Sequence, residues 1–230
     1  MKTLNDCLYY HEDGPPVIDI YCGDCLEIMP LLPKVDLVVT DPPYLVDWQS
    51  NRRDVKHDLI QNDDSEDWLK PSFKAIYDLM NDNSLCISFY GWPEMDKFAV
   101  AWKEAGFELK SHFVFIKNNI GLGWFTRRQH EQACLLSKGS PEKPTKAPSD
   151  VIQAWDGTGN EYHPTQKPVA SIKSIIMPYT GDLILDPFLG SGTTLVACKE
   201  LKRNGIGIEI NEKYCKIATT RLKNTQMPFL

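Results

Sequence analysis

The stretch Leu183–Thr194 reads LILDPFLGSGTT, which is typical of a buried strand, a glycine-rich turn and the start of a helix. Gly190 and Gly192 lack side chains, so a ligand can approach the backbone of the turn closely. A second apolar strand ends at Glu209, 23 positions after Asp186. An acidic side chain at that place can bind both ribose hydroxyls of an adenosine-containing ligand. The pattern predicts a cofactor site at the ends of these two strands.

Three details of the turn favour S-adenosylmethionine over a nicotinamide dinucleotide. The pattern Gly190-x-Gly192-x-x-Leu195 lacks the third glycine of the dinucleotide fingerprint. Asp186 would repel a pyrophosphate but would accept from an α-ammonium group, and the turn has no Lys or Arg to meet phosphates. Thr193 or Thr194 can cap the helix that follows. The residues expected at the cofactor from this motif are Asp186, Gly190, Ser191, Gly192, Thr193 and Glu209. A nicotinamide oxidoreductase is the alternative.

Short apolar runs recur along the chain between amphipathic stretches, as in a mostly parallel sheet with helices on both faces. We expect a seven-stranded sheet with strands at residues 17–21, 35–39, 85–89, 113–116, 133–136, 183–185 and 205–208. Helices are expected at residues 25–32, 66–81, 93–105, 168–178, 192–203 and 211–224. Residues 109–136 are predicted to form an antiparallel hairpin at one sheet edge. The fold class is therefore α/β, a single Rossmann-like domain over residues 1–230.

The composition excludes several classes of protein. The chain has 230 residues, of which 42% are hydrophobic and 24% are charged, as in ordinary globular domains. No apolar run approaches the ~20 residues of a membrane helix, and the N-terminus lacks the apolar core of a secretory signal. The seven cysteines are an odd number scattered along the chain, so we expect reduced thiols and a cytoplasmic protein without membrane contact.

Charge is distributed unevenly along the sequence. The net charge is −6, yet residues 110–146 contain seven basic and two acidic side chains. Nucleic-acid binding depends on clustered cations and not on the overall charge of a protein. A local basic surface on an acidic body is therefore compatible with DNA or RNA as a partner.

The tetrapeptide Asp41-Pro42-Pro43-Tyr44 follows the expected strand at residues 35–39, and ligands of open α/β sheets bind beyond the carboxyl ends of strands. Two prolines form a stiff segment without N–H donors. That segment presents only acceptors, which are the Asp41 carboxylate and nearby carbonyls, with Tyr44 as a stacking surface. Such a site suits an exocyclic amino group, because two acceptors favour a tetrahedral nitrogen with a localised lone pair. The alternative is a rigid turn with no chemical role.

Two further acidic or thiol features are weaker signals. Asp24 follows the first expected strand, where it can accept from an adenine amino group or cap the helix that begins near Leu26. Cys22 and Cys25 form a CxxC pair, but the spacing to Cys7 and His11 upstream is irregular for zinc. We therefore expect no metal.

Together these segments resemble the S-adenosylmethionine-dependent DNA amino-methyltransferases, which modify adenine N6 or cytosine N4. Asp41–Tyr44 matches the catalytic motif of that family, and Asp186–Thr194 matches its cofactor motif. The segments His163–Pro168, Gly23–Glu27 and Arg128–Glu131 also resemble family segments. The catalytic motif precedes the cofactor motif, as in the permuted β group. The resemblance spans nearly the whole chain.

The resemblance implies roles for particular residues. Phe188 would flank the cofactor, Glu209 would bind its ribose, and Asp24 would lie near its adenine. Lys167 and Pro168 would lie by its methionine end. An Asp at the first catalytic position fits adenine N6 better than cytosine N4, and members of the group often form homodimers. The alternatives are cytosine N4, an RNA or protein amide substrate, and a non-catalytic DNA-binding subunit.

DNA contacts are expected in three segments. Residues 45–64 carry Arg52 and Arg53 and are predicted to be a mobile substrate loop. In the segment 124–128, Arg127 and Arg128 can contact phosphates, and the aromatic pair beside them can act as a wedge or can pack in the core. Residues 139–162 are predicted to be a minimal target-recognition segment, since family members usually carry a larger segment here. Lys143 and Lys146 are its expected phosphate contacts.

Overall fold

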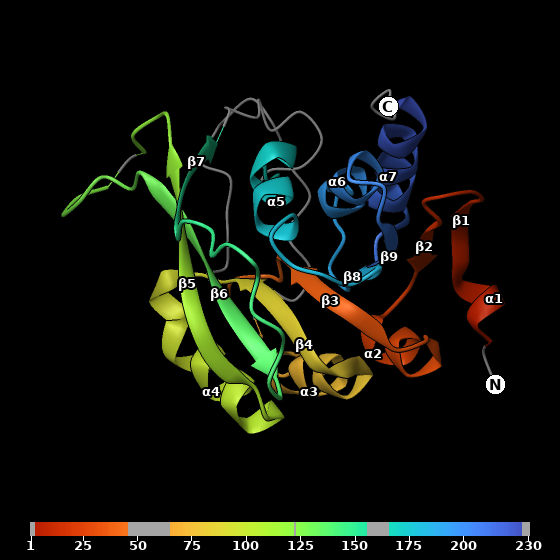
Figure 1. Cartoon of the computed structure of the whole chain (residues 1–230), viewed down its shortest axis with the longest axis horizontal. Helices are drawn as coiled ribbons and strands as arrows, with labels where there is room; N and C mark the ends of the chain where they lie inside the picture. Colours follow the sequence, from red (N-terminus) through yellow and green to blue (C-terminus); the bar gives the residue numbers. More distant parts are fainter. Residues whose placement is uncertain (1–2, 46–64, 122, 156–165, 227–230) are drawn as a thin grey trace.

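The computed structural model describes residues 3–45, 65–121, 123–155 and 166–226, and its centre is one nine-stranded sheet (Figure 1). The strand order is β1-β2-β9-β8-β3-β4-β6-β5-β7. The strands are β1 (Leu8–Glu12), β2 (Ile18–Cys22), β3 (Val35–Thr40), β4 (Met80–Phe89), β5 (Glu108–Lys117), β6 (His130–Lys138), β7 (Val151–Trp155), β8 (Leu183–Asp186) and β9 (Asn204–Glu209).

Helices cover both faces of the sheet, as the sequence predicts. On one face lie α2 (Cys25–Ile28), α3 (Leu69–Leu79) and α4 (Met95–Ala105), and on the other lie α5 (Val169–Ile176), α6 (Thr193–Glu200) and α7 (Glu212–Asn224). A short α1 (Leu4–Cys7) and two 3₁₀ turns, η1 (Met29–Leu31) and η2 (Trp92–Glu94), complete the elements. Among the described residues, no helix has the length and apolar character needed to cross a bilayer.

The expected seven strands are all present, but the prediction of a seven-stranded sheet is wrong because β1 and β7 extend it at its two edges. Both extra strands are short and lack a continuous apolar run. The residues of β1 are half-buried or exposed, as is usual for an edge strand with one face in solvent. Apolar patterning identifies buried strands, and so it does not reveal these two.

The position of the predicted hairpin also needs correction. β5 and β6 pair antiparallel as expected, with Phe113 opposite Ala133. β7 pairs parallel with β5 on its outer side, so the hairpin lies inside the sheet and not at its edge. The antiparallel contacts are β1–β2, β4–β6 and β5–β6, and the other five strand contacts are parallel. The sheet is therefore mixed, with a parallel majority.

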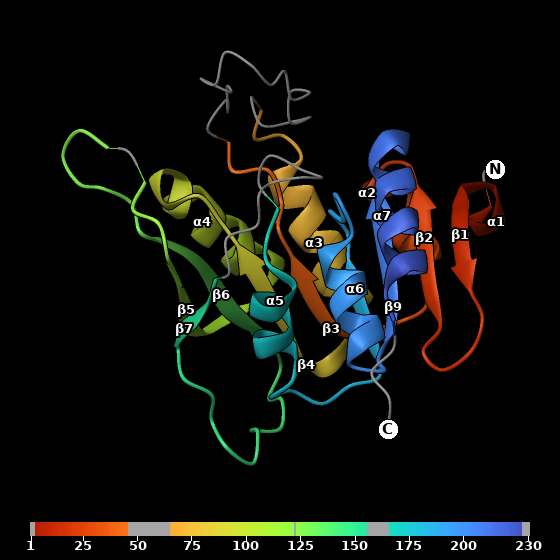
Figure 2. The same ribbon diagram turned by 90° about the horizontal axis from the view of Figure 1, so that it is seen from above.

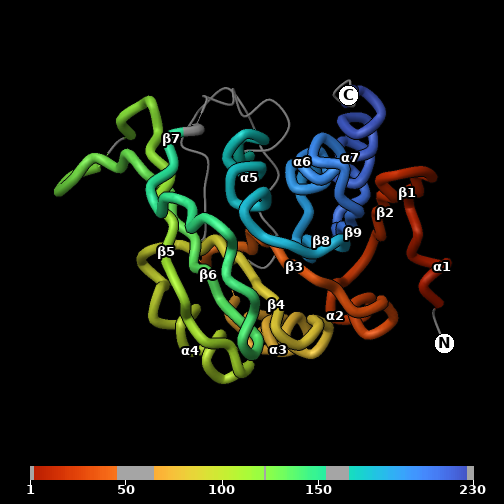
Figure 3. The backbone as a smooth tube through the Cα atoms, viewed as in Figure 1, coloured from red at the N-terminus to blue at the C-terminus, as the bar shows by residue number. Residues whose placement is uncertain are grey.

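Parallel pairing gathers the ends of distant strands at one edge. β3 pairs with β8, β8 with β9, and β9 with β2, all in the same direction. The carboxyl ends of these strands therefore lie together, and each is followed or ended by an acidic residue: Asp41, Asp186, Glu209 and Asp24. Figure 3 shows β3, from the first fifth of the chain, directly beside β8 from its last quarter. The fold thus joins the two predicted motifs at one edge.

Candidate active site

The Asp41 carboxylate, directly after β3, is held from two parts of the chain. Its Oδ1 accepts a hydrogen bond from the Tyr44 hydroxyl at 2.7 Å, and its Oδ2 accepts from Lys167 Nζ at 2.5 Å. Lys167 stands 126 positions away in the sequence, next to the start of α5. The catalytic and cofactor halves of the predicted site therefore share a direct ion pair.

The Lys167 ammonium lies in an enclosed position. Its side chain is only 6% exposed, and the Nζ lies 5.2 Å from the centre of the Tyr44 ring and 5.0 Å from that of Phe89. Aromatic faces stabilise a cation that has left water. The family resemblance implies that Lys167 lies near the cofactor, but it does not reveal that Asp41 is the partner of its ammonium group.

Tyr44 is fixed so that its hydroxyl acts as a donor. Burial, followed by the negative charges of Asp41 and Glu131, holds the pKa of Tyr44 well above its ordinary value. The ring lies against Gly91, where an added Cβ would come within 2.9 Å of Tyr44 Cβ. Gly91 therefore provides the space in which the tyrosine packs, and Tyr44 stays neutral at physiological pH.

Asp186 is the buried acid at the end of β8. Its side chain is 3% exposed, and it accepts from the Thr194 hydroxyl at 2.6 Å and from Phe188 N–H at 3.1 Å. Burial, with smaller contributions from the charges of Asp41 and Glu209, raises the pKa of Asp186 to about 7. Asp41, Asp186 and Glu209 are therefore close enough to repel one another, and a cationic ligand beside them would relieve that repulsion.

The glycine turn between β8 and α6 has the geometry that its sequence predicts. Gly190 and Gly192 adopt φ angles of 54° and 86°, which side chains disfavour. A Cβ at Gly192 would come within 2.7 Å of Ala218 Cβ on α7. Gly192 itself occupies the N-cap, and no side chain caps α6. The expected cap by Thr193 or Thr194 is therefore wrong, because the Thr194 hydroxyl bonds Asp186 instead.

Glu209 fastens the turn from the neighbouring strand. Its Oε2 accepts from Gly190 N–H and its Oε1 from Asn211 N–H, both at 2.8 Å. Burial raises the pKa of Glu209 in spite of these bonds. Each carboxylate oxygen retains a second lone pair, so the ribose role of Glu209 stays a prediction that its geometry permits.

Arg221 on α7 is a residue that sequence reasoning missed. Its Nη1 donates to Ser191 O at 2.7 Å, to Ser191 Oγ at 3.0 Å and to Thr193 Oγ1 at 3.1 Å. Both hydroxyls therefore face α7, and their expected contribution to cofactor binding stays untested. No local motif marks Arg221, because only the packing of α7 brings it to the turn.

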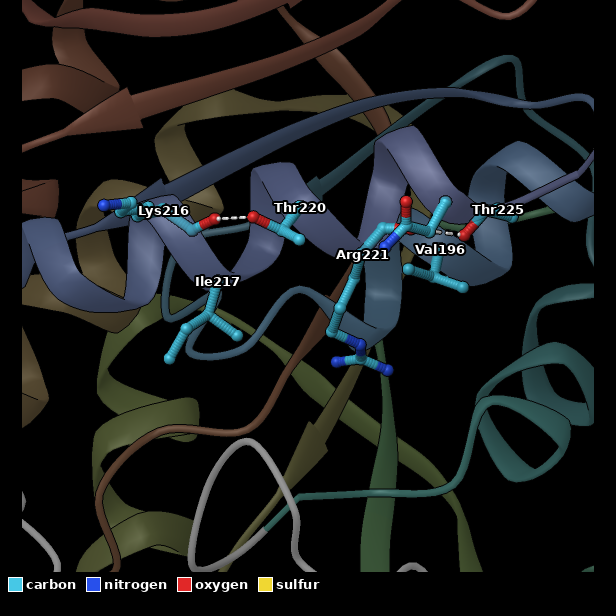
Figure 4. Close-up of a pocket in the computed structure, with 7 residues that line it drawn as sticks. Val196, Lys216, Ile217, Thr220, Arg221 and Thr225 are labelled. Carbon is cyan, nitrogen blue, oxygen red and sulfur yellow. Dashed lines mark hydrogen bonds between the residues drawn. The ribbon is translucent and has the colours of Figure 1, made fainter.

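Arg221 also lines a pocket of about 430 Å³ between α6 and α7 (Figure 4). The pocket is lined by Val196, Lys216, Ile217, Thr220, Arg221, Asn224 and Thr225. None of these is a predicted catalytic or cofactor residue. The pocket is therefore not the predicted site, whose residues lie at the strand ends described above.

Phe188, Pro168 and Asp24 are the other residues expected at the cofactor. The Phe188 ring meets the Trp68 ring edge-on at 5.3 Å between centres, and Pro168 is buried at the start of α5. The Asp24 side chain accepts from Leu26 N–H at 2.8 Å and caps α2. The capping alternative for Asp24 is therefore confirmed, and its contact with adenine stays a prediction.

The structure separates the predicted DNA-binding residues. Arg127 and Arg128 are exposed in the loop between β5 and β6, which extends beyond the same edge as the end of β3 (Figure 2). Lys143 and Lys146 are exposed in the connection that leaves β6 beside Ser84, at the opposite edge. Arg52 and Arg53, with nearly all of the predicted 45–64 loop, lie outside the described residues, as do residues 156–162 of the target-recognition segment.

No metal centre is visible in the part of the chain that the structure describes, where no group of three His, Cys, Asp or Glu side chains could hold an ion. All seven cysteines are free thiols. Burial raises the pKa values of Cys25 and Cys198 to about 12, so neither is a ready nucleophile.

The fold and the site together define an α/β enzyme of the methyltransferase type. The chain belongs to the DNA methylase family, whose N6_N4_Mtase pattern matches residues 35–220. The family expected from the motifs is thus confirmed.

Known relatives are similar to this chain over most of their length. The protein YubD of Escherichia coli (strain K12), described as a methylase, is 40% identical over 208 residues, which cover 89% of each chain. The type II methyltransferase M2.MboI of Moraxella bovis is 28% identical over 251 residues, covering 92% of this chain and 90% of the relative. The crystal structure of the M1.HpyAVI–SAM complex is 29% identical, has a TM-score of 0.71 and covers 89% of this chain and 98% of its own.

Proposed function

We propose that this DNA methyltransferase transfers a methyl group from S-adenosylmethionine to N6 of an adenine that has been flipped out of DNA. The observation that carries the proposal is the Asp41 carboxylate, which is joined through Lys167 to the cofactor half of the chain. The choice of adenine rests on Asp, and not Ser, at the first position of the catalytic motif. The type II name of M2.MboI supports a role in restriction–modification.

S-adenosylmethionine is the cofactor, as in the M1.HpyAVI complex, and the donor set fits it. The ligand carries two positive centres, an α-ammonium and a sulfonium, and the edge offers the acidic side chains of Asp186 and Glu209. When bound, it supplies an electrophilic methyl group. Asp186 would accept from the ammonium, Glu209 would bind the ribose, and Phe188 would flank the cofactor.

The target base must leave the duplex, because Asp41 cannot reach an amino group that is stacked and paired. Asp41 Oδ1 now accepts from the Tyr44 hydroxyl, and an exocyclic N–H of the base would take over that acceptor. Lys167 would keep Oδ2 and the orientation of the carboxylate, while the carbonyls of the Pro42-Pro43 segment accept the second N–H. Tyr44 would stack on the base. The amino nitrogen would form its bond to the methyl group as the bond from that group to the sulfonium breaks, and the proton that the nitrogen then loses would pass to Asp41 Oδ1. The raised pKa values of Cys25 and Cys198 fit such a direct transfer without a covalent enzyme intermediate.

Cytosine N4 is the second candidate, since the same acceptors suit its amino group. A non-catalytic DNA-binding subunit and methylation of RNA or of a protein amide are the remaining alternatives. One experiment tests catalysis on DNA and separates the two bases: the protein is incubated with labelled S-adenosylmethionine and native DNA of mixed sequence, and the nucleosides are analysed. We expect labelled N6-methyladenine. Label in N4-methylcytosine would replace adenine as the target, and unlabelled DNA would overturn the proposal.

A homodimer in the cytoplasm is also proposed, on the strength of the family resemblance and the free thiols. Light scattering at several protein concentrations tests the dimer. A mass near twice 26.2 kDa is expected, and a monomer mass at every concentration would contradict it.

A further inference from the structure

Two aromatic side chains stand fully in solvent at the tip of the β5–β6 hairpin. Trp124 is 101% exposed and Phe125 is 102% exposed. Single exposed apolar residues are ordinary on a protein surface, but two adjacent large aromatics with no cover usually mark a binding site. The alternative that this pair packs in the core is therefore wrong.

The tip that carries these rings has a defined shape. Lys117 N–H donates to Gln129 O at 2.8 Å and Gly121 N–H donates to Arg128 O at 2.7 Å, so the hairpin ladder continues past the strand ends. A Cβ at Gly121 would come within 2.9 Å of Arg128 O, and one at Gly123 within 1.9 Å of Thr126 O. Only glycine allows the chain to turn here so tightly. The two rings are thus carried by a loop whose base is held by backbone hydrogen bonds.

The hairpin is rooted in the proposed active site. Thr40 lies beside Ser88 on β4, and Ser88 lies opposite Cys134 on β6, so the tip projects beyond the same edge as Asp41 (Figure 2). At its root, Glu131 pairs with Lys117, and the Glu131 charge contributes to the raised pKa of Tyr44. A partner that reaches Tyr44 from this side therefore meets the tip.

The charge of the tip matches a polyanion. Arg127 and Arg128 follow the aromatic pair and are exposed, and residues 118–130 contain no acidic side chain. Arg127 Nε donates to Gly121 O at 3.2 Å, and the side chain is otherwise exposed to solvent. Guanidinium groups bind phosphates, and aromatic rings insert between bases. Duplex DNA offers phosphates for the arginines and stacked bases for the rings.

We propose that Trp124 and Phe125 form a wedge that enters the base stack of duplex DNA beside the flipped nucleotide, with Arg127 and Arg128 on the flanking phosphates. The inference rests on the proposed function and extends it to how the target is extruded. A base that leaves the stack opens a gap, and an apolar ring that fills the gap lowers the cost of flipping. The wedge makes duplex DNA the substrate.

The test compares wild type with the double variant Trp124→Ala/Phe125→Ala on native DNA. Stacking is lost at each truncated ring, so kcat/KM for methylation should fall at least about tenfold. The exchanged pair Trp124→Phe/Phe125→Trp should stay within about threefold, because it keeps both rings. Met177→Ala removes an exposed apolar side chain far from the tip and serves as the matched control. Methylation by the alanine pair within twofold of wild type would overturn the wedge.

A second readout does not depend on methyl transfer. The difference in fluorescence between wild type and Trp124→Phe isolates the emission of Trp124, and insertion between bases should quench it by more than half when native DNA is added. An unquenched Trp124 would contradict insertion even if the alanine pair is slow. If wild type transfers no label to DNA, the proposed function fails, while the quenching still decides whether the wedge binds duplex DNA.

Discussion

Lys167 is the residue that links the two ends of the chain. Its ammonium is the cation that pairs with Asp41, in a region where Asp186 and Glu209 add further negative charge. Burial takes the lysine out of water, and the pairing with Asp41 and the rings of Tyr44 and Phe89 offset that cost. Loss of the cation would leave the Asp41 carboxylate with only the Tyr44 hydroxyl of its two partners.

We therefore expect Lys167→Met to lower methyl transfer at least about tenfold and to lower the free energy of unfolding by about 1–3 kcal/mol. Lys167→Arg keeps the charge and should recover part of the rate, which a purely structural role would not require. Steady-state kinetics and urea unfolding measure both effects. A Lys167→Met variant that methylates at the wild-type rate would remove the positioning role.

Asp186 makes the stability of the cofactor-free protein depend on pH. Its pKa is raised from 3.8 to about 7 in the folded state, so between these values the folded protein binds more protons than the unfolded chain. The free energy of unfolding contributed by this group therefore falls as pH rises. Asp186→Asn lacks this titrating group. The free energy of unfolding of wild type should therefore fall, relative to that of the variant, by about 2 kcal/mol from pH 5 to 7. Denaturant unfolding at several pH values measures this fall, and a constant difference between the two proteins would contradict the assignment.

The glycine turn between β8 and α6 is the element that depends most on distant support. Glu209 holds it from β9 through Gly190 N–H, and Arg221 holds it from α7 through Ser191 and Thr193. A turn with two glycines at positive φ has a flexible backbone when these bonds are absent. The conformation of the turn is therefore a property of three elements together.

Arg221→Ala should accordingly weaken S-adenosylmethionine binding about five- to thirtyfold, since about 1–2 kcal/mol of hydrogen bonding to the turn is lost. Arg221 has no expected contact with the ligand, so the effect would act through the turn. Lys216→Ala, on the same helix and in the same pocket, is the control and should bind normally. Equal calorimetric affinities for Arg221→Ala and wild type would show that the turn needs no support from α7.

At the scale of the whole molecule, apolar runs sufficed to predict all seven buried strands and the helices on both faces. They missed β1 and β7, whose residues lie at sheet edges and need no apolar periodicity. The stiff tetrapeptide Asp41–Tyr44 and the glycine turn were predictable because each depends on local backbone chemistry. The Asp41–Lys167 pair and Arg221 were not, since they arise only when the chain packs.

The basic region predicted at residues 110–146 is likewise divided by the fold. Arg127 and Arg128 extend beyond the edge where β3 ends, whereas Lys143 and Lys146 lie in the connection that leaves the opposite edge. Sequence charge alone does not show this, because β6 reverses the chain direction between the two groups. We thus expect Arg127→Gln/Arg128→Gln to make the slope of log K for DNA binding against log salt concentration shallower, by the amount that about two phosphate contacts contribute. A slope unchanged from wild type would exclude both arginines from the DNA contact.

The most direct test of the account is Asp41→Ala, measured for cofactor affinity by calorimetry and for methyl transfer to native DNA. The carboxylate is assigned to the target amino group and not to the cofactor, so affinity should stay within about threefold while transfer falls at least about a hundredfold. A folded Asp41→Ala protein that methylates DNA as fast as wild type would contradict the account.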